Sequence, residues 1–168
     1  MKRSRHFSFH VDKQKKQIHV THIFDAPRAI VWYAWTTAAI LDLWWAPKPW
    51  ITKTKTMVFS DGGHWHYAMI GPAGETHWSI TAYANIVAEH SFTAVDRFCD
   101  AEGKTDLSLP CNSWDNNFSD QDAGTLVTNN LQFDSLADLD KTIAMGFKEG
   151  FSAALMNLEH YLSTMHPG

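Results

Sequence analysis

The sequence predicts an α+β fold in which a curved antiparallel sheet wraps around one long C-terminal helix. Three observations predict it. A strand followed by two short helices opens the domain, two-residue periodicity with turn signals runs through residues 51–133, and an apolar stripe at helical spacing fills residues 135–165. Such a stripe needs an apolar sheet face to cover it, so we expect the sheet to bend around the helix.

The opening elements are predicted from residues 17–50. In "QIHVTHIFDAP", alternate residues from Ile18 to Phe24 share one strand face, and Pro27 closes the strand at a favourable first-turn position for a helix. "RAIVWYAWTTAAILDLWW" has apolar residues at helical spacing, and Thr36 and Thr37 divide it into two short helices. The next residues, "APKPW", cannot continue a regular helix because prolines lack a backbone donor.

Six strand-like runs follow, at residues 51–59, 63–70, 75–87, 91–98, 106–118 and 124–133, with "DGG" and "GPAGE" as tight turns. A one-residue change of register in the run 75–87 exchanges its two faces. The sequence therefore leaves two alternatives for the residues that point inward: Trp78, Ile80 and Ala82, or His77, Ser79, Thr81 and Tyr83.

The last third of the chain is expected to form one continuous amphipathic helix, with an apolar stripe that contains Ile143, Phe147, Phe151, Leu155, Leu158 and Leu162. Gly146 and Gly150 each cost this helix about 1 kcal/mol relative to alanine, and they share a face. We attribute both to close packing against the sheet or the short helices. The alternative is that the missing side chains leave room above the sheet for another molecule.

Composition bounds the class of protein. The 168 residues have a formal net charge of −4, which gives no general attraction to nucleic acid or to an anionic membrane, so neither is expected as a partner. Residues 1–16 form a basic N-terminal tail or an extra strand, and residues 17–165 form a single domain. Cys99 and Cys111 are expected to be reduced, because no export signal or bilayer-length run is visible. We expect a cytoplasmic protein.

Histidines provide the alternative of a metal site. His64 and His66 share a strand face, and His77 from the next strand could face them, which is a zinc or copper ligand set. The same alternation assigns Trp65 and Tyr67 to the core and turns the histidines toward solvent. We therefore expect neither a metal nor a cofactor.

Several strings resemble one family. "HIFDAPRAIVWYAWTTAAILDLWWAPK", "DGGHWHYAMIGPAGE", "GTLVTNNLQF" and "GFKEGFSAALMNLEHYL" occur in the order found in the activator of heat-shock-protein ATPase homologues, within the START-like (SRPBCC) superfamily that contains birch-pollen-allergen-like proteins. The resemblance covers roughly residues 17–163. It implies a helix-grip fold with a central cavity. Because the separate chaperone-docking domain of the co-chaperone is not seen here, a chaperone partner is not expected.

Aromatic residues dominate the positions expected to line that cavity. Trp44 and Trp45 are predicted to wall it, while Trp50 starts the next strand; the alternative is that these indoles pack as a small core under a proline-rigid loop. The predicted ligand-binding residues are Trp44, Trp45, Trp65, Tyr67, Met69, Trp78, Phe92, Trp114, Phe133, Phe147 and Phe151.

The sequence contains no recognisable catalytic constellation, so we name no catalytic residue and favour binding of a small hydrophobic or aromatic molecule over catalysis. The first alternative is a cyclase or hydratase acting on an aromatic polyketide-like substrate, with Tyr67, Tyr83, His77 or Asn129 as acid, base or orienting donor. The second is a chaperone-associated accessory protein. The oligomeric state is left open, a homodimer included.

Overall fold

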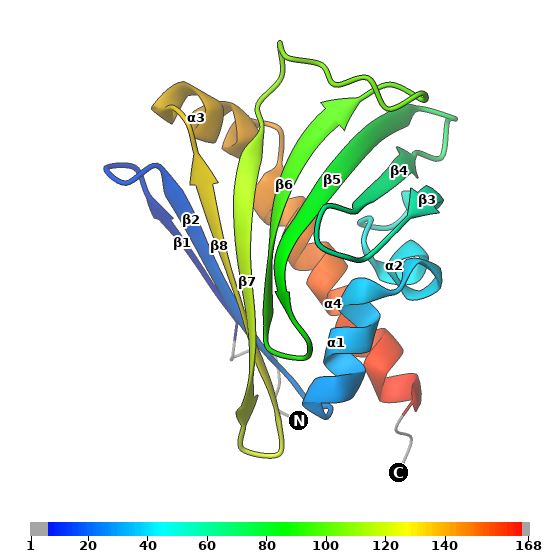
Figure 1. The fold of residues 1–168 in the computed structure, drawn as a ribbon, viewed down its shortest axis with the longest axis vertical. Coiled ribbons are helices and arrows are strands. Elements are labelled where there is room, and N and C mark those ends of the chain that lie inside the picture. The colour runs from blue at the N-terminus through cyan, green and yellow to red at the C-terminus, as the bar shows by residue number, and fades with distance from the viewer. Residues whose placement is uncertain (1–6, 166–168) are drawn as a thin grey trace.

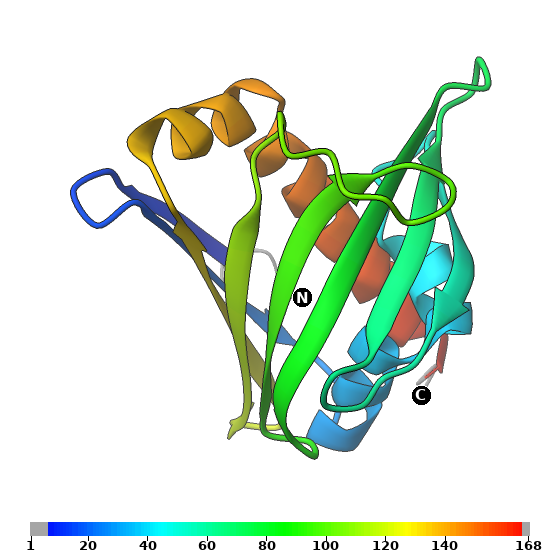
Figure 2. The same ribbon diagram turned by 45° about the horizontal axis from the view of Figure 1, so that its top comes forward.

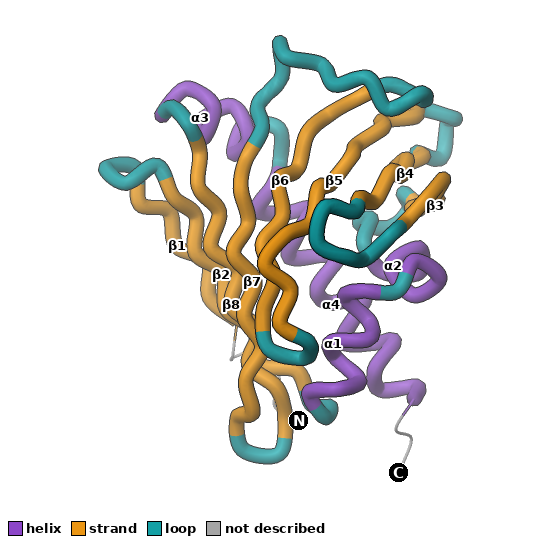
Figure 3. Tube along the Cα trace, in the orientation of Figure 1, coloured by secondary structure: helices purple, strands orange, loops and turns teal. Residues whose placement is uncertain are grey.

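The computed structural model describes residues 7–165. Figure 1 shows a large bent sheet with helices on its concave side, and Figure 3 separates helices, strands and loops by colour. The strands are β1 (Phe7–Asp12), β2 (Gln17–Phe24), β3 (Ile51–Met57), β4 (His64–Ile70), β5 (Thr76–Val87), β6 (Ser91–Cys99), β7 (Asn112–Gln121) and β8 (Gly124–Phe133). The helices are α1 (Arg28–Thr36), α2 (Ala38–Trp44), α3 (Leu136–Ala144) and α4 (Phe147–Met165).

All eight strands form one antiparallel sheet in the order β1-β2-β8-β7-β6-β5-β4-β3. Helix α4 lies diagonally across the concave face, with α1 and α2 beside it (Figure 1). The predicted α+β architecture, a sheet curved around a long C-terminal helix after two short helices, is confirmed. Within the N-terminal segment, residues 7–12 form β1, whereas residues 1–6 lie outside the described part of the chain.

Strand β2 has the alternation that its sequence indicates. Ile18, Val20, His22 and Phe24 are buried, and the residues between them are half-buried. The predicted run 106–118 differs, because β7 begins only at Asn112. Asp106 instead forms a turn in which its carboxylate accepts hydrogen bonds from the backbone and hydroxyl of Ser108, and Pro110 cannot donate to a sheet ladder. Residues 100–111 therefore form a loop over one end of the sheet (Figure 2).

The expected single C-terminal helix is divided into two. Gly146 has φ +91°, a left-handed conformation that ends α3 before α4 begins. A side chain at Gly146 would meet no atom within 4 Å, so packing does not explain this glycine, and that prediction was wrong. Close packing does not require Gly150 either, because an added Cβ would lie 3.7 Å from Pro47, an ordinary contact distance. The break places the α3–α4 junction at the same end of the molecule as the loop 100–111 (Figure 2).

Candidate ligand-binding site

The tryptophans at the end of α2 have separate environments. Trp44 is fully buried, and its indole N–H donates to the Ala34 carbonyl at 3.1 Å. Trp45 turns toward the sheet and donates to the Tyr67 hydroxyl at 3.1 Å. Asn157 on α4 donates to the Ala46 carbonyl at 2.9 Å, which anchors the segment that follows α2. Of the two predicted wall residues, therefore, Trp45 lines a cavity and Trp44 belongs to the core.

A cavity of about 470 Å³ lies between strands β4–β7, the α3–α4 junction and the segment after α2. We call it the main cavity. It is partly open to solvent, and the exposed residues His77 and Met145 belong to its lining. The full lining is Trp45, Pro47, Trp50, Tyr67, Met69, His77, Ser79, Asp96, Arg97, Phe98, Pro110, Asn112, Trp114, Thr142, Met145, Gly146, Phe147, Gly150 and Phe151.

The main cavity brings together about half of the residues predicted from sequence: Trp45, Tyr67, Met69, Trp114, Phe147 and Phe151. Trp65 and Phe92 instead border a smaller space that is described below. Trp44 and Phe133 are core residues that line neither space. Trp50 directly precedes β3, as predicted, and also lines the main cavity, where its ring stacks on His77 at 5.5 Å between centroids.

Trp78 lies on the opposite face of the sheet, so its predicted cavity position is wrong. Tyr67 is paired with Ser79 and Met69 with His77, which turns His77, Ser79, Thr81 and Tyr83 inward. The outward Trp78 is half-buried, with Lys55 Nζ 5.8 Å from its ring centroid and the His66 ring at 5.0 Å. The loop 100–111 covers this region, since His66 is hydrogen-bonded to the Asp100 carbonyl at 3.0 Å. The loop 100–111 therefore partly buries Trp78 on the outer face of the sheet.

The same register separates the three histidines that were considered as metal ligands. His77 faces inward beside Met69, whereas His64 and His66 face outward opposite Ala82 and Ile80. Among residues 7–165, no three His, Cys, Asp or Glu side chains are grouped so as to hold a metal ion.

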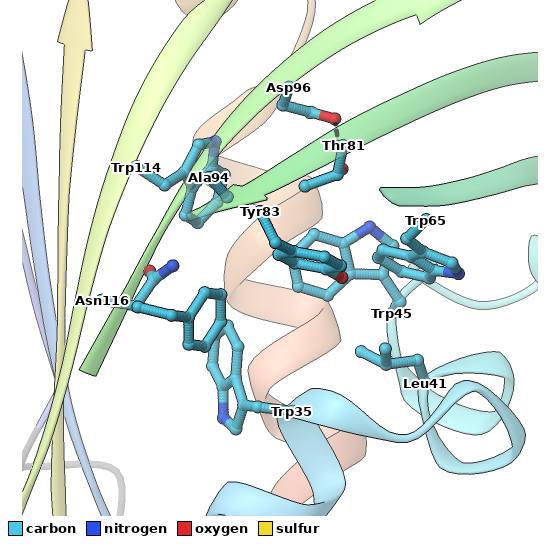
Figure 4. A pocket seen from close by; sticks show the side chains of 11 residues that line it. Trp35, Leu41, Trp45, Trp65, Thr81, Tyr83, Ala94, Asp96, Trp114 and Asn116 are labelled. Carbon is cyan, nitrogen blue, oxygen red and sulfur yellow. Dashed lines mark hydrogen bonds between the residues drawn. The ribbon is translucent and has the colours of Figure 1, made fainter. Parts of the chain in front are cut away.

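A small void of about 30 Å³ adjoins the main cavity (Figure 4). It is lined by Trp35, Leu41, Trp45, Trp65, Thr81, Tyr83, Phe92, Ala94, Asp96, Trp114 and Asn116. A space of this size can hold a water molecule but not an organic ligand. Trp45, Asp96 and Trp114 border both spaces, so these three residues form the partition between them.

Asp96 is the polar residue of this partition, and sequence reasoning missed it. Thr81 donates to its carboxylate at 2.9 Å (Figure 4), and burial raises the pKa of Asp96 to about 6. A signal was present in the sequence, because Phe92, Ala94 and Phe98 alternate along β6 and an acidic residue at position 96 continues the same inward face.

Two tyrosines stand near Asp96. Burial raises the pKa of Tyr67 well above its usual value, and the charge of Asp96 raises it further. The pKa of Tyr83 is raised by the same two causes. Both phenols therefore remain neutral at physiological pH. The Tyr67 hydroxyl accepts from the Trp45 indole N–H and also interacts with the Ser79 side chain, so it is held at the cavity wall.

The bent sheet, the terminal helix laid across it and the cavity between them define a START-like helix-grip domain. The family described as Activator of Hsp90 ATPase homolog 1-like protein matches residues 25–163, and the chain belongs to that family. No curated protein matches the chain. None of the helices within residues 7–165 combines the length and apolar character needed to cross a membrane.

Solved structures have the same fold. Protein Ms6760 from Mycobacterium smegmatis is 25% identical, with a TM-score of 0.86 over 92% of this chain and 95% of its own. A protein from Arthrobacter aurescens is 26% identical, with a TM-score of 0.88 over 94% and 91%. A protein from Staphylococcus epidermidis is 26% identical, with a TM-score of 0.81 over 92% and 94%. None of these three names states an activity.

Proposed function

We propose that the protein binds one small hydrophobic or aromatic molecule in the main cavity, as a cytoplasmic binding protein. The observation that supports this most strongly is the space itself. At about 470 Å³ it falls within the range of roughly 300–1,000 Å³ that is typical of small-molecule sites. Aromatic side chains from the sheet, from α4 and from the segment after α2 surround it, with few polar groups among them.

The geometry of the rings favours a flat ligand. Phe147 and Phe151 stack with centroids 5.3 Å apart and an interplanar angle of 15°, so they present a continuous aromatic surface on α4. Trp114 meets Phe151 edge-on at 5.4 Å from the sheet side. An aromatic ligand packed against these rings in the cavity would gain both apolar burial and ring contacts.

The test is isothermal titration calorimetry with 2-(1-naphthyl)ethanol, a neutral aromatic probe, on the wild type and two variants at position 150. Gly150→Leu adds a side chain that projects into the cavity, and leucine is a good helix former. Gly150→Ala is the matched control, because its Cβ makes only ordinary contact with Pro47 at 3.7 Å. We expect binding to the wild type and the alanine variant and a loss of at least about tenfold in the leucine variant.

Equal affinity in all three proteins, or no binding to the wild type, would contradict the proposal. Native mass spectrometry of protein purified gently from its own host complements the titration, since it reports the mass of the assembly and of any retained compound together.

A cyclase or hydratase is the second candidate, and Asp96 favours it. A carboxyl group whose pKa is about 6, beside the neutral Tyr67 hydroxyl, is suited to general acid–base work. Of the other residues considered for this role, His77 lies at the exposed mouth, and Asn129 is engaged in a hydrogen bond to Asn116 at 2.6 Å. Turnover of a linear polyketide-like substrate that is lost in Asp96→Asn would support the enzyme over the carrier.

A further inference from the structure

Two acceptors on the sheet wall of the main cavity, Asp96 and Asn112, have unused hydrogen-bonding capacity, beside one unpaired donor, the Trp114 indole N–H. Asp96 on β6 is directly opposite Asn112 on β7, and both line the cavity. The side-chain carbonyl oxygen of Asn112 is buried without a hydrogen-bond partner. Asp96 receives a side-chain hydrogen bond only from Thr81 within residues 7–165, which leaves most of the capacity of its carboxylate unused. Buried acceptors of this kind are costly unless a donor reaches them.

The charge of Asp96 is also uncompensated. The ion pairs among the described residues are Lys13–Asp140, His22–Glu159 and Arg28–Asp120, none of them in the cavity. Arg97 contributes to the lining, but it is paired with Ile80 on the outward side of β6. With its pKa raised to about 6, Asp96 is still mostly ionised at pH 7.5. The cavity therefore holds a carboxylate that lacks a cationic partner.

Aromatic rings enclose the space next to this carboxylate. Trp45 and Trp114 border it directly as the other members of the partition, and Phe147 and Phe151 face it from α4. Rings attract a cation through their negatively charged faces, and tryptophan does so best. An ammonium group placed here would gain hydrogen bonds, charge neutralisation and cation–π contacts together, whereas a carboxylate would be repelled.

We propose, building on the function proposed above, that the main cavity selects an aromatic molecule carrying a protonated amine, with the ammonium group against Asp96 and Asn112 and the ring packed against the cavity side of Trp114 and Phe151. The remaining apolar space accommodates the ring system. Fatty acids and other apolar anions are the ligands that this arrangement excludes.

The experiment compares three probes of matched size: 2-(1-naphthyl)ethylamine, 2-(1-naphthyl)ethanol and 1-naphthylacetate. Each is titrated calorimetrically into the wild type, Asp96→Asn and Glu149→Gln at pH 7.5. Asp96→Asn preserves the shape and an acceptor for Thr81 while removing the charge. Glu149→Gln makes the same charge change at an exposed position on α4 outside the cavity lining.

In the wild type and in Glu149→Gln, the amine should bind at least about tenfold more tightly than the alcohol, and the acetate most weakly. In Asp96→Asn the preference for the amine should disappear while the alcohol binds as before. Binding of the alcohol without a preference for the amine, or a preference that survives in Asp96→Asn, overturns this inference and leaves the proposed function standing. Binding of none of the three probes overturns both.

Discussion

The space between the sheet and α4 has two halves that use the same residue types in different ways. Around α1, Trp35 packs on Trp44 at 4.9 Å and on Phe118 at 5.9 Å, and it borders the small void. Around the α3–α4 junction, Trp114, Phe147 and Phe151 also contact one another, but they line the main cavity on one side. Aromatic content alone therefore does not distinguish a filled core from a binding site.

Two features of the second half keep it hollow. The helix break at Gly146 and the bare position at Gly150 remove side chains from the helix wall. The sheet wall also carries the polar residues Ser79, Asp96 and Asn112. Filling the cavity with apolar side chains is unfavourable, because it would bury these polar groups without hydrogen-bond partners. The region around α1, which we call the packed half, stabilises the fold. The region around the α3–α4 junction, which we call the hollow half, has room for a ligand.

The largest expected effect comes from the adjacent pair Trp44 and Trp45. Trp44→Ala removes a fully buried indole and should lower the free energy of unfolding by about 3–5 kcal/mol. Trp45→Ala should cost less, about 1–3 kcal/mol, since one side of its ring already faces the cavity, but it should weaken probe binding. Urea unfolding and calorimetry of both variants check this. Equal stability losses would contradict the distinction between the two halves.

A smaller effect of opposite sign is expected at Asp96. Its pKa is about 6 when folded and 3.8 in the reference state, so the carboxylate lowers stability as pH rises from about 4 through 6, and acidification restores it. Two pKa units correspond to at most about 3 kcal/mol; because Asp96 retains some accessible surface toward the cavities, we expect Asp96→Asn to gain about 1–2 kcal/mol at pH 7.5.

The measurement is urea unfolding of the wild type and Asp96→Asn at pH 7.5 and pH 5. The gain should shrink at the lower pH. A variant that is less stable than the wild type at pH 7.5 would show that the carboxylate supports the fold instead of straining it.

The smallest expected changes in stability are those of alanine substitutions at the two glycines, Gly146 and Gly150. Gly146→Ala places a Cβ at φ +91° and should lower the free energy of unfolding by about 1–2 kcal/mol. Gly150→Ala, in a regular helix with room beside Pro47, should raise it by up to about 1 kcal/mol. Thermal denaturation of both variants measures the difference. The same sign for both substitutions would be inconsistent with their separate roles.

The architecture could be predicted from the sequence because almost every element has the spacing of apolar residues that is typical of its strand or helix. The alternation of β2 and the stripe of α4 each specify a buried face without help from distant residues. The break at Gly146 was missed because a glycine inside an apolar stripe has the same pattern whether it packs closely or ends a helix. Only the backbone conformation separates the two.

The site was harder to predict because it depends on register and on which half of the interior is filled. Trp78 and His77 are neighbours, and one residue of register decides which of them faces the cavity. Trp44 and Trp45 look equivalent in sequence, yet both have helical backbone conformation, so their side chains point about 100° apart and reach different environments. The alternation that places Phe92 on the inward face of β6 also places Asp96 there. This was not predicted, because acidic residues are rarely buried on an inward face.

The most direct test of the hollow half is a crystal structure of the protein soaked with 1-iodonaphthalene, located through the anomalous signal of iodine. We expect a single strong peak in the main cavity, beside Trp45, Trp114 and Phe151. A cavity without iodine, in crystals that bind the compound elsewhere on the protein, would contradict it.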